Sequence, residues 1–239
     1  MDTKLLISCE HAGNEVPEEY THLFEDDPET LQTHRGIDIG ALNLTNTIAQ
    51  EMGQRPYIHT ITRLLVDLNR SVQSPTLFSE FTEEEPISVR EDIFKNYYRP
   101  HRKKVEKRIE QIIDNGNRAL HVGIHTFTPV WNGSARDVDV GFLFDPTRAA
   151  EQEFCGYWHQ ALSEQMPKLR LRMNQPYRGT MDGFTTYLRR NYSDNRYAGM
   201  EIEVSQRFPS SEPEKEWNKL QHTIADSLES AVTSLRAKK

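Results

Sequence analysis

The stretch Lys4-Leu-Leu-Ile-Ser-Cys-Glu10, near the start of the chain, is a short apolar run that ends in a carboxylate. A run of this length, followed by a loop with Gly13, Asn14 and Pro17, is typical of a buried strand. The residues over 36–52 come next and carry apolar side chains at helical spacing. A strand therefore precedes a helix, and the fold class depends on whether this pattern repeats.

The pattern repeats along most of the chain. The last predicted strand, over 199–205, alternates apolar and polar side chains, which is the period of a strand. Further strands are predicted over 57–66, 119–127, 138–144 and 169–173, and further helices over 100–116, over 151–165 and from a capping box at 211–214 to Leu235. Strands that alternate with helices favour the α/β class, here a three-layer α/β/α sandwich with a mixed, largely parallel central sheet. The length predicts a single domain over residues 1–239.

Composition and charge exclude several classes of protein. The net charge of −7 argues against nucleic acid as the main partner. The longest apolar runs are far shorter than the roughly 20 residues that span a bilayer, and we see no signal-peptide pattern. Two cysteines, Cys9 and Cys155, do not make a disulfide framework and fit a reducing compartment. We expect a cytoplasmic protein without a membrane partner, and the sequence does not indicate its oligomeric state.

The segment Thr60-Ile-Thr-Arg-Leu-Leu-Val-Asp-Leu-Asn-Arg70 ends an apolar run with an amide and a guanidinium, seven residues after Arg63. The planar guanidinium of arginine binds a carboxylate through two parallel hydrogen bonds. Two arginines and Asn69 at one strand end therefore predict a pocket for a small anionic substrate. Because the whole protein is acidic, such a pocket must carry its positive charge locally.

Histidines and carboxylates stand at the ends of three other predicted strands. His11 follows the first strand, with Glu10 and Glu15 beside it, and His125 and Glu203 lie in two later strands. In open α/β sheets, ligands bind beyond the carboxyl ends of the strands. Two histidines and carboxylates from separate strands could form a zinc site with an open coordination position.

Each of these residues also has an ordinary structural interpretation. His125, in an apolar strand, could be a hydrogen-bonded core histidine, and Cys9 could be a buried thiol or, with His11, a nucleophile. Glu203 could be solvent-exposed together with Glu201, but a strand between two helical layers has no wet face. A carboxylate buried there is costly unless it is paired or functional, which favours a working role for Glu203.

Six motifs, in this order along the chain, give it a resemblance to a known family. They are Ser8-Cys-Glu-His-Ala-Gly-Asn-Glu-Val-Pro17, Thr62-Arg-Leu-Leu-Val-Asp-Leu-Asn-Arg70, Gly123-Ile-His-Thr-Phe-Thr-Pro129, Asp139-Val-Gly-Phe142, Asn174-Gln-Pro-Tyr177 and Gly199-Met-Glu-Ile-Glu-Val-Ser-Gln206. Together they resemble the N-formylglutamate amidohydrolase family over residues 4 to about 206. That family is similar in layout to aspartoacylases and zinc carboxypeptidases, whose Asn-Arg pair holds a substrate carboxylate.

The resemblance implies a zinc-dependent hydrolase, with Zn²⁺ held by His11, His125 and one carboxylate. The metal motif of the relatives is His-x-x-Glu, whereas this chain has His11-x-x-x-Glu15, one residue longer. Asp38 is the alternative carboxylate ligand, because the segment around it also resembles a family motif. His34, in the same segment, is a weaker candidate and is expected at the surface or behind the ligands.

The resemblance also implies roles for the remaining site residues. Glu203 would be the general base, and Arg63 would stabilise the oxyanion or bind a carboxylate. Asn69 and Arg70 would anchor the α-carboxylate, with Asp67 orienting Arg70. Arg136 would add an anion contact, Tyr177 and Arg178 would line the pocket mouth, and the loop over 73–89 is either a lid or a plain surface loop.

The expected substrate is a small anionic N-acyl amino acid, foremost N-formyl-L-glutamate, which would yield formate and L-glutamate. Two alternatives stay open at this point. One is an amidohydrolase for another N-acyl amino acid. The other is a catalytically silent protein that binds a metal or a carboxylate.

Overall fold

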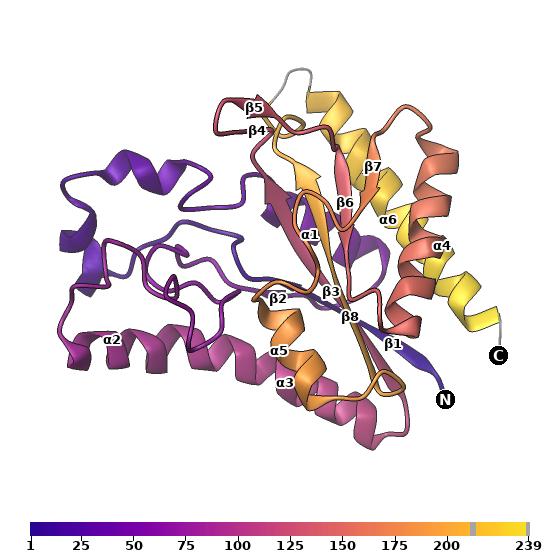
Figure 1. Cartoon of the computed structure of the whole chain (residues 1–239), viewed down its shortest axis with the longest axis horizontal. Coiled ribbons are helices and arrows are strands. Elements are labelled where there is room, and N and C mark those ends of the chain that lie inside the picture. Colours follow the sequence, from indigo (N-terminus) through magenta and orange to yellow (C-terminus); the bar gives the residue numbers. More distant parts are fainter. Residues whose placement is uncertain (211–213, 238–239) are drawn as a thin grey trace.

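Six strands form the central sheet of the structure, a computed structural model that describes residues 1–210 and 214–237 (Figure 1). The strands are β1 (Thr3–Cys9), β2 (Tyr57–Ile58), β3 (Arg118–Phe127), β6 (Val140–Leu143), β7 (Leu171–Met173) and β8 (Tyr197–Ser205). They lie in the order β2-β1-β3-β8-β6-β7. Neighbouring strands are parallel except β6 and β8, which are antiparallel. The prediction of a mixed, largely parallel sheet is confirmed.

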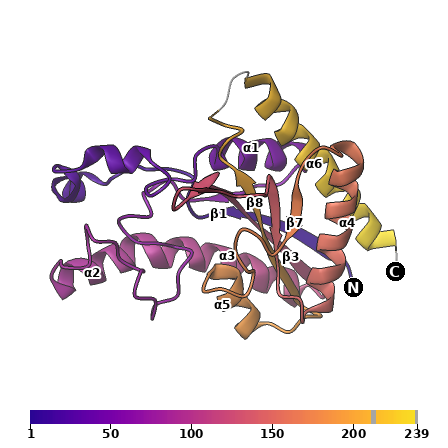
Figure 2. The same cartoon turned by 45° about the horizontal axis from the view of Figure 1, so that its top comes forward.

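Helices cover both faces of this sheet. The helices α1 (Ala41–Glu51), α4 (Ala149–Gln165) and α6 (Glu214–Ala237) share one apolar core with the sheet. The helices α3 (Arg99–Asp114) and α5 (Phe184–Asn191) pack in a second core against the other face. Figure 2 shows the strands between these two groups of helices. The predicted three-layer α/β/α arrangement is therefore confirmed.

The two faces of the sheet differ in polarity. Alternate residues such as Ile7, Val122 and Ile202 are fully buried against α1, α4 and α6. On the opposite face, His125 of β3 lies in register with Glu203 of β8. Because the side chains of a strand alternate between faces, β3 and β8 present a polar stripe on one side and an apolar stripe on the other. Polar groups buried in this way must be hydrogen-bonded or functional.

The predicted strand over 57–66 is wrong beyond its first two residues. β2 ends at Ile58, and Ile61 makes only one further bridge, to Glu15. Residues 64–66 instead turn into a third apolar cluster. That cluster includes Tyr20, Phe24, Leu64, Leu65, Val66, Ile93 and Tyr98. The apolar run is buried by side-chain packing without strand pairing.

The helix predicted over 100–116 begins earlier. α2 (Ile87–Ile93), a π-helical turn (Phe94–Tyr98) and α3 follow one another without a break. Pro100 lies in the first turn of α3, where it removes one backbone N–H, and the π-helical turn directly precedes it. Of the loop predicted over 73–89, residues 87–89 therefore belong to α2.

Several short elements were not predicted. They are two 3-10 helices (Glu18–Phe24 and Pro28–Gln32), the hairpin of β4 (Val130–Trp131) and β5 (Ser134–Ala135), and α5. The helix predicted over 36–52 begins at Ala41, after Gly40 with a φ of 88°. The predicted capping box lies mostly outside the described residues. Among the described helices, none is both long and apolar enough to cross a membrane.

Candidate metal centre and catalytic cavity

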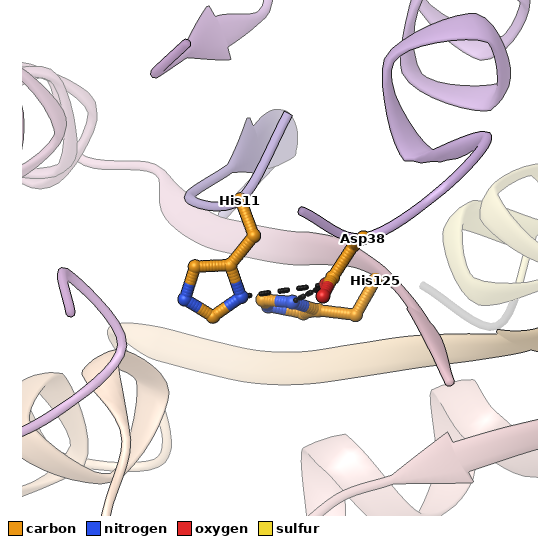
Figure 3. A group of neighbouring side chains, drawn as sticks. All are labelled: His11, Asp38 and His125. Carbon is orange, nitrogen blue, oxygen red and sulfur yellow. Dashed lines mark hydrogen bonds and ion pairs between the residues drawn. The ribbon is translucent and has the colours of Figure 1, made fainter. Parts of the chain in front are cut away.

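Three buried side chains, His11, Asp38 and His125, meet near the carboxyl ends of β1 and β3 (Figure 3). His11 follows β1, Asp38 lies in the loop before α1, and His125 lies near the end of β3. Their potential ligand atoms all lie within 4.8 Å of one another. The Nδ1 atoms of His125 and His11 are 2.9 Å and 3.4 Å from Asp38 Oδ2. This donor set suits a divalent metal such as zinc.

The other ring nitrogen of each histidine faces a second carboxylate. His11 Nε2 is 2.7 Å from Asp67 Oδ1, and His125 Nε2 is 3.4 Å from Glu10 Oε2. A carboxylate behind a histidine fixes the tautomer that leaves the opposite nitrogen free for a metal. Both imidazoles are therefore oriented with Nδ1 toward Asp38, so that the three potential ligand atoms face one another.

Arg63 connects the two carboxylates on the His11 side. Its guanidinium donates to Asp67 Oδ2 at 2.6 Å and to Asp38 Oδ1 at 3.3 Å. Burial raises the pKa of Asp38, but His11, His125 and Arg63 outweigh that effect and hold it well below its usual range. Asp67 thus orients His11 and Arg63, not the guanidinium of Arg70 as expected. Arg63 contributes to the cavity wall while bound to both carboxylates.

Glu203 lies beside this group with one oxygen unpaired. It is buried, lines the cavity, and its Oε2 atom has no hydrogen-bond partner within residues 1–210 and 214–237. Burial raises the pKa of the Glu203 carboxyl to about 8; the charge of His125 opposes this shift, and those of Asp38 and Glu201 add to it. A carboxyl with such a pKa can exchange a proton near neutrality.

The raised pKa predicts a pH-dependent stability effect in the metal-free protein. The folded state favours protonated Glu203, so its stabilising contribution is present below the ordinary pKa of 4.5 and is lost as pH rises through about 8. Replacing Glu203 with Gln, which never ionises, should raise the melting temperature at pH 8 by about 2–4 °C for each kcal/mol relieved. Thermal unfolding at pH 4 is the control, because the two proteins should differ little there. An equal difference at both pH values would contradict the assignment.

Glu15 does not join the metal group. Its exposed carboxylate accepts a hydrogen bond from Thr60 Oγ1 at 2.8 Å, and its backbone bridges to Ile61. The chain turns after β1, so His11 and Glu15 enter different surroundings. Of the two alternative carboxylates, the structure brings Asp38 to the histidines. His34 is exposed and lines the cavity, with its ring 6.4 Å from that of Trp131.

Cys9 gains no support as a nucleophile. It is fully buried on the apolar side of the sheet, in the core formed with α1, α4 and α6. Burial raises the pKa of its thiol to about 12, against an opposing effect of His125. The thiolate is the reactive form of cysteine, so a thiol in this state is inert at neutral pH.

A cavity of about 540 Å³ opens beside the metal group. Asn69 lines it; its amide nitrogen is 3.5 Å from His125 Nε2, and its side-chain oxygen accepts from the N–H of Phe184 at 2.6 Å. Arg70 also lines the cavity, and no carboxylate of the described residues forms an ion pair with its guanidinium. Tyr177 and Arg178 line the cavity as well.

Arg136 does not lie on the cavity wall. Its guanidinium donates to the hydroxyl of Tyr177 at 3.0 Å and to the carbonyl of Thr128 at 3.2 Å. Its hydrogen-bond partner Tyr177, in contrast, does line the cavity. The predicted direct contact between Arg136 and an anion in the cavity is therefore not supported.

Sequence reasoning missed other residues that line the cavity or contact its histidines. Glu10 was recognised only as a strand-end carboxylate, although it pairs with His125 and also lies 3.4 Å from His101 Nε2. Glu201 lines the cavity and accepts from Thr185 at 3.1 Å. Trp131 gave a usable signal, because a tryptophan in the polar segment between two strands is unusual on a surface.

Comparisons with known proteins bear on the fold and on the family of this chain. No protein with a curated description matches the sequence. The crystal structure of a gene product from Agrobacterium tumefaciens is similar, with a TM-score of 0.83 and 24% identity over 97% of this chain and 91% of that one. An N-formylglutamate amidohydrolase from Ralstonia eutropha JMP134 has a TM-score of 0.75 and 16% identity over 98% and 94%. These two structures show a shared fold. The model of the N-formylglutamate amidohydrolase family matches residues 3–208, so this chain belongs to that family.

Proposed function

We propose that the protein is a zinc-dependent amidohydrolase that cleaves N-formyl-L-glutamate, or a closely related N-acyl amino acid, to the acid and the free amino acid. Membership of an amidohydrolase family supports amide hydrolysis. The observation that carries the proposal is the buried group of His11, Asp38 and His125 beside the unpaired carboxylate of Glu203. Three protein ligands and a neighbouring base form the usual catalytic zinc site.

The side chains divide the chemistry between them. A zinc ion held by His11, Asp38 and His125 would supply Lewis acidity and lower the pKa of water. Glu203 removes a proton from water as the water oxygen attacks the acyl carbon. The carbon–nitrogen bond then breaks, and Glu203 returns the proton to the leaving amine, which gives formate and the amino acid.

In this proposal, two arginines and an asparagine bind the substrate. Arg70 binds the α-carboxylate, and Asn69 stands between that position and His125. Arg63, held by Asp38 and Asp67, offers positive charge near the acyl oxygen. This local charge lets a protein with a net charge of −7 bind an anion.

Replacing Arg70 with Ala tests the anchor. We expect KM for N-formylglutamate to rise by about 10- to 100-fold with a smaller change in kcat, because a hydrogen-bonded charge contributes about 1.5–3 kcal/mol. Steady-state kinetics measure both constants. Arg108→Ala, at an exposed position on α3, is the matched control. An unchanged KM in Arg70→Ala would remove Arg70 from the anchor.

One assay tests the whole proposal. Purified protein is analysed for metal content and then given N-formyl, N-acetyl and N-succinyl amino acids while amine release is measured. We expect about one zinc per chain and the fastest release from the N-formyl compounds. Stoichiometric zinc without hydrolysis of any compound would show a binding protein instead.

A further inference from the structure

A cluster of aromatic rings forms one wall of the cavity and has no role in the proposal above. The guanidinium carbon of Arg136 lies 4.9 Å from the ring centre of Tyr177, 5.3 Å from that of Trp131 and 5.5 Å from that of Phe127. All three rings line the cavity, while Arg136 does not. We call Phe127, Trp131 and Tyr177 the aromatic wall.

Arg136, which does not line the cavity, holds the three rings of the aromatic wall in place. A cation over the face of an aromatic ring attracts it, and Arg136 contacts three rings at once. The hydrogen bonds from Arg136 to the Tyr177 hydroxyl and to the Thr128 carbonyl fix the guanidinium in place. The rings come from β3, from the β4–β5 hairpin and from the loop after β7, so Arg136 joins three separate segments. A surface held in this way is preorganised for a ligand.

One member of the aromatic wall, Trp131, is exposed, whereas Phe127 is buried and Tyr177 is partly buried. Trp131 is 50% exposed and Met181 is 56% exposed, and both line the cavity. The other two tryptophans, Trp158 and Trp217, are buried in the core. Large exposed apolar groups that gather at a cavity mark a ligand-binding surface, in contrast to singly scattered ones.

The cavity has room for such a ligand. Its volume of about 540 Å³ lies within the roughly 300–1,000 Å³ of sites that enclose drug-sized molecules. The α-carboxylate and the amide need only Arg70, Asn69 and the metal group. Neither a formyl group nor the carboxylate of a glutamate side chain would contact the aromatic wall through apolar surface.

We propose that the preferred substrate is an N-acyl amino acid that carries an aromatic or branched apolar group, which packs against Trp131 in the aromatic wall. This inference rests on the proposed amidohydrolase function and changes its preferred substrate from N-formyl-L-glutamate to an N-acyl amino acid with an apolar group. The apolar group belongs either to the amino acid side chain or to the acyl part. The chemistry of the wall is the same for both.

A comparison of kcat/KM between matched compounds tests the inference. The zinc-loaded enzyme is assayed with N-formyl-phenylalanine, N-formyl-leucine, N-phenylacetyl-glutamate and N-formyl-glutamate. We expect kcat/KM for the best apolar compound to exceed that for N-formyl-glutamate by about tenfold or more, as burial of one apolar side chain allows. The phenylalanine and phenylacetyl compounds show which part of the substrate carries the ring.

Trp131→Ala should reduce this ratio by about tenfold, and Trp131→Phe should restore much of it. Val130→Ala is the matched control, because Val130 is equally exposed on the same hairpin but does not line the cavity. A ratio that favours N-formyl-glutamate and does not change in Trp131→Ala would overturn the inference while leaving the proposed function intact. Absence of hydrolysis with all four compounds would instead overturn the proposed function and the inference with it.

Tryptophan fluorescence gives a second measurement that does not need turnover. In the Glu203→Gln variant, N-formyl-phenylalanine should quench or shift the emission of the exposed Trp131 at lower concentration than N-formyl-glutamate does. The same titration in a protein that also carries Trp131→Ala should show no such signal, because the buried Trp158 and Trp217 do not meet the ligand. An identical signal with and without Trp131 would count against the wall as the binding surface.

Discussion

Replacing Glu203 with Gln should lower kcat by about two to four orders of magnitude while the protein keeps its metal. The amide preserves the size of the side chain but cannot take the proton of water. Because Glu203 is not one of the three residues whose ligand atoms meet, metal content should stay near that of the unaltered protein. Initial rates at saturating substrate and metal analysis of the same samples measure both quantities.

Glu201→Gln is the matched control for this experiment. Glu201 lies two residues earlier on β8 and on the same face, but its carboxylate accepts a hydrogen bond from Thr185. Its replacement should lower kcat far less than that of Glu203. Near-normal turnover in Glu203→Gln would show that another group acts as the base.

Replacing Asp38 or His125 with Ala should abolish stable metal binding and activity together. An outer carboxylate that only orients a ligand changes metal affinity by about 10- to 100-fold, and loss of a direct ligand should exceed that range. Metal content after dialysis against a chelator measures the effect, and zinc should no longer raise the melting temperature.

Glu15→Ala is the comparison that separates the two carboxylates proposed from sequence. Glu15 is exposed and bound to Thr60, so its removal should leave metal content and the zinc-dependent rise in melting temperature as they are. If Asp38→Ala binds zinc as tightly as the unaltered protein and Glu15→Ala does not, the metal centre has been assigned to the wrong carboxylate.

The fold could be predicted where local pattern and burial agree. β8 alternates apolar and polar residues because one face packs on helices and the other faces the cavity. The run ending at Val66 misled the prediction, because an apolar run is equally consistent with burial in irregular chain. Its partners, such as Phe24 and Ile93, come from short or distant elements with no readable period.

The site could be predicted in part for a similar reason. His11, His125 and Glu203 stand at the ends of readable strands, so their meeting follows from a parallel sheet. Asp38 lies in irregular chain before α1, and its position depends on contacts with His11 and Arg63 that spacing does not encode. The prediction that Arg136 contacts an anion rested on its charge alone, and the sequence does not reveal the three rings that surround its guanidinium.

The strand order has a consequence for synthesis of the chain on the ribosome. β8 is the last strand to be made, yet it lies between β3 and β6 at the middle of the sheet. Residues that precede it include all three candidate metal ligands, whereas Glu203 arrives with β8 itself. Without β8, β3 would present an open edge to solvent, and such an edge is a site for mispairing and aggregation. Completion of the sheet and placement of Glu203, the proposed general base, therefore both depend on the last strand of the chain.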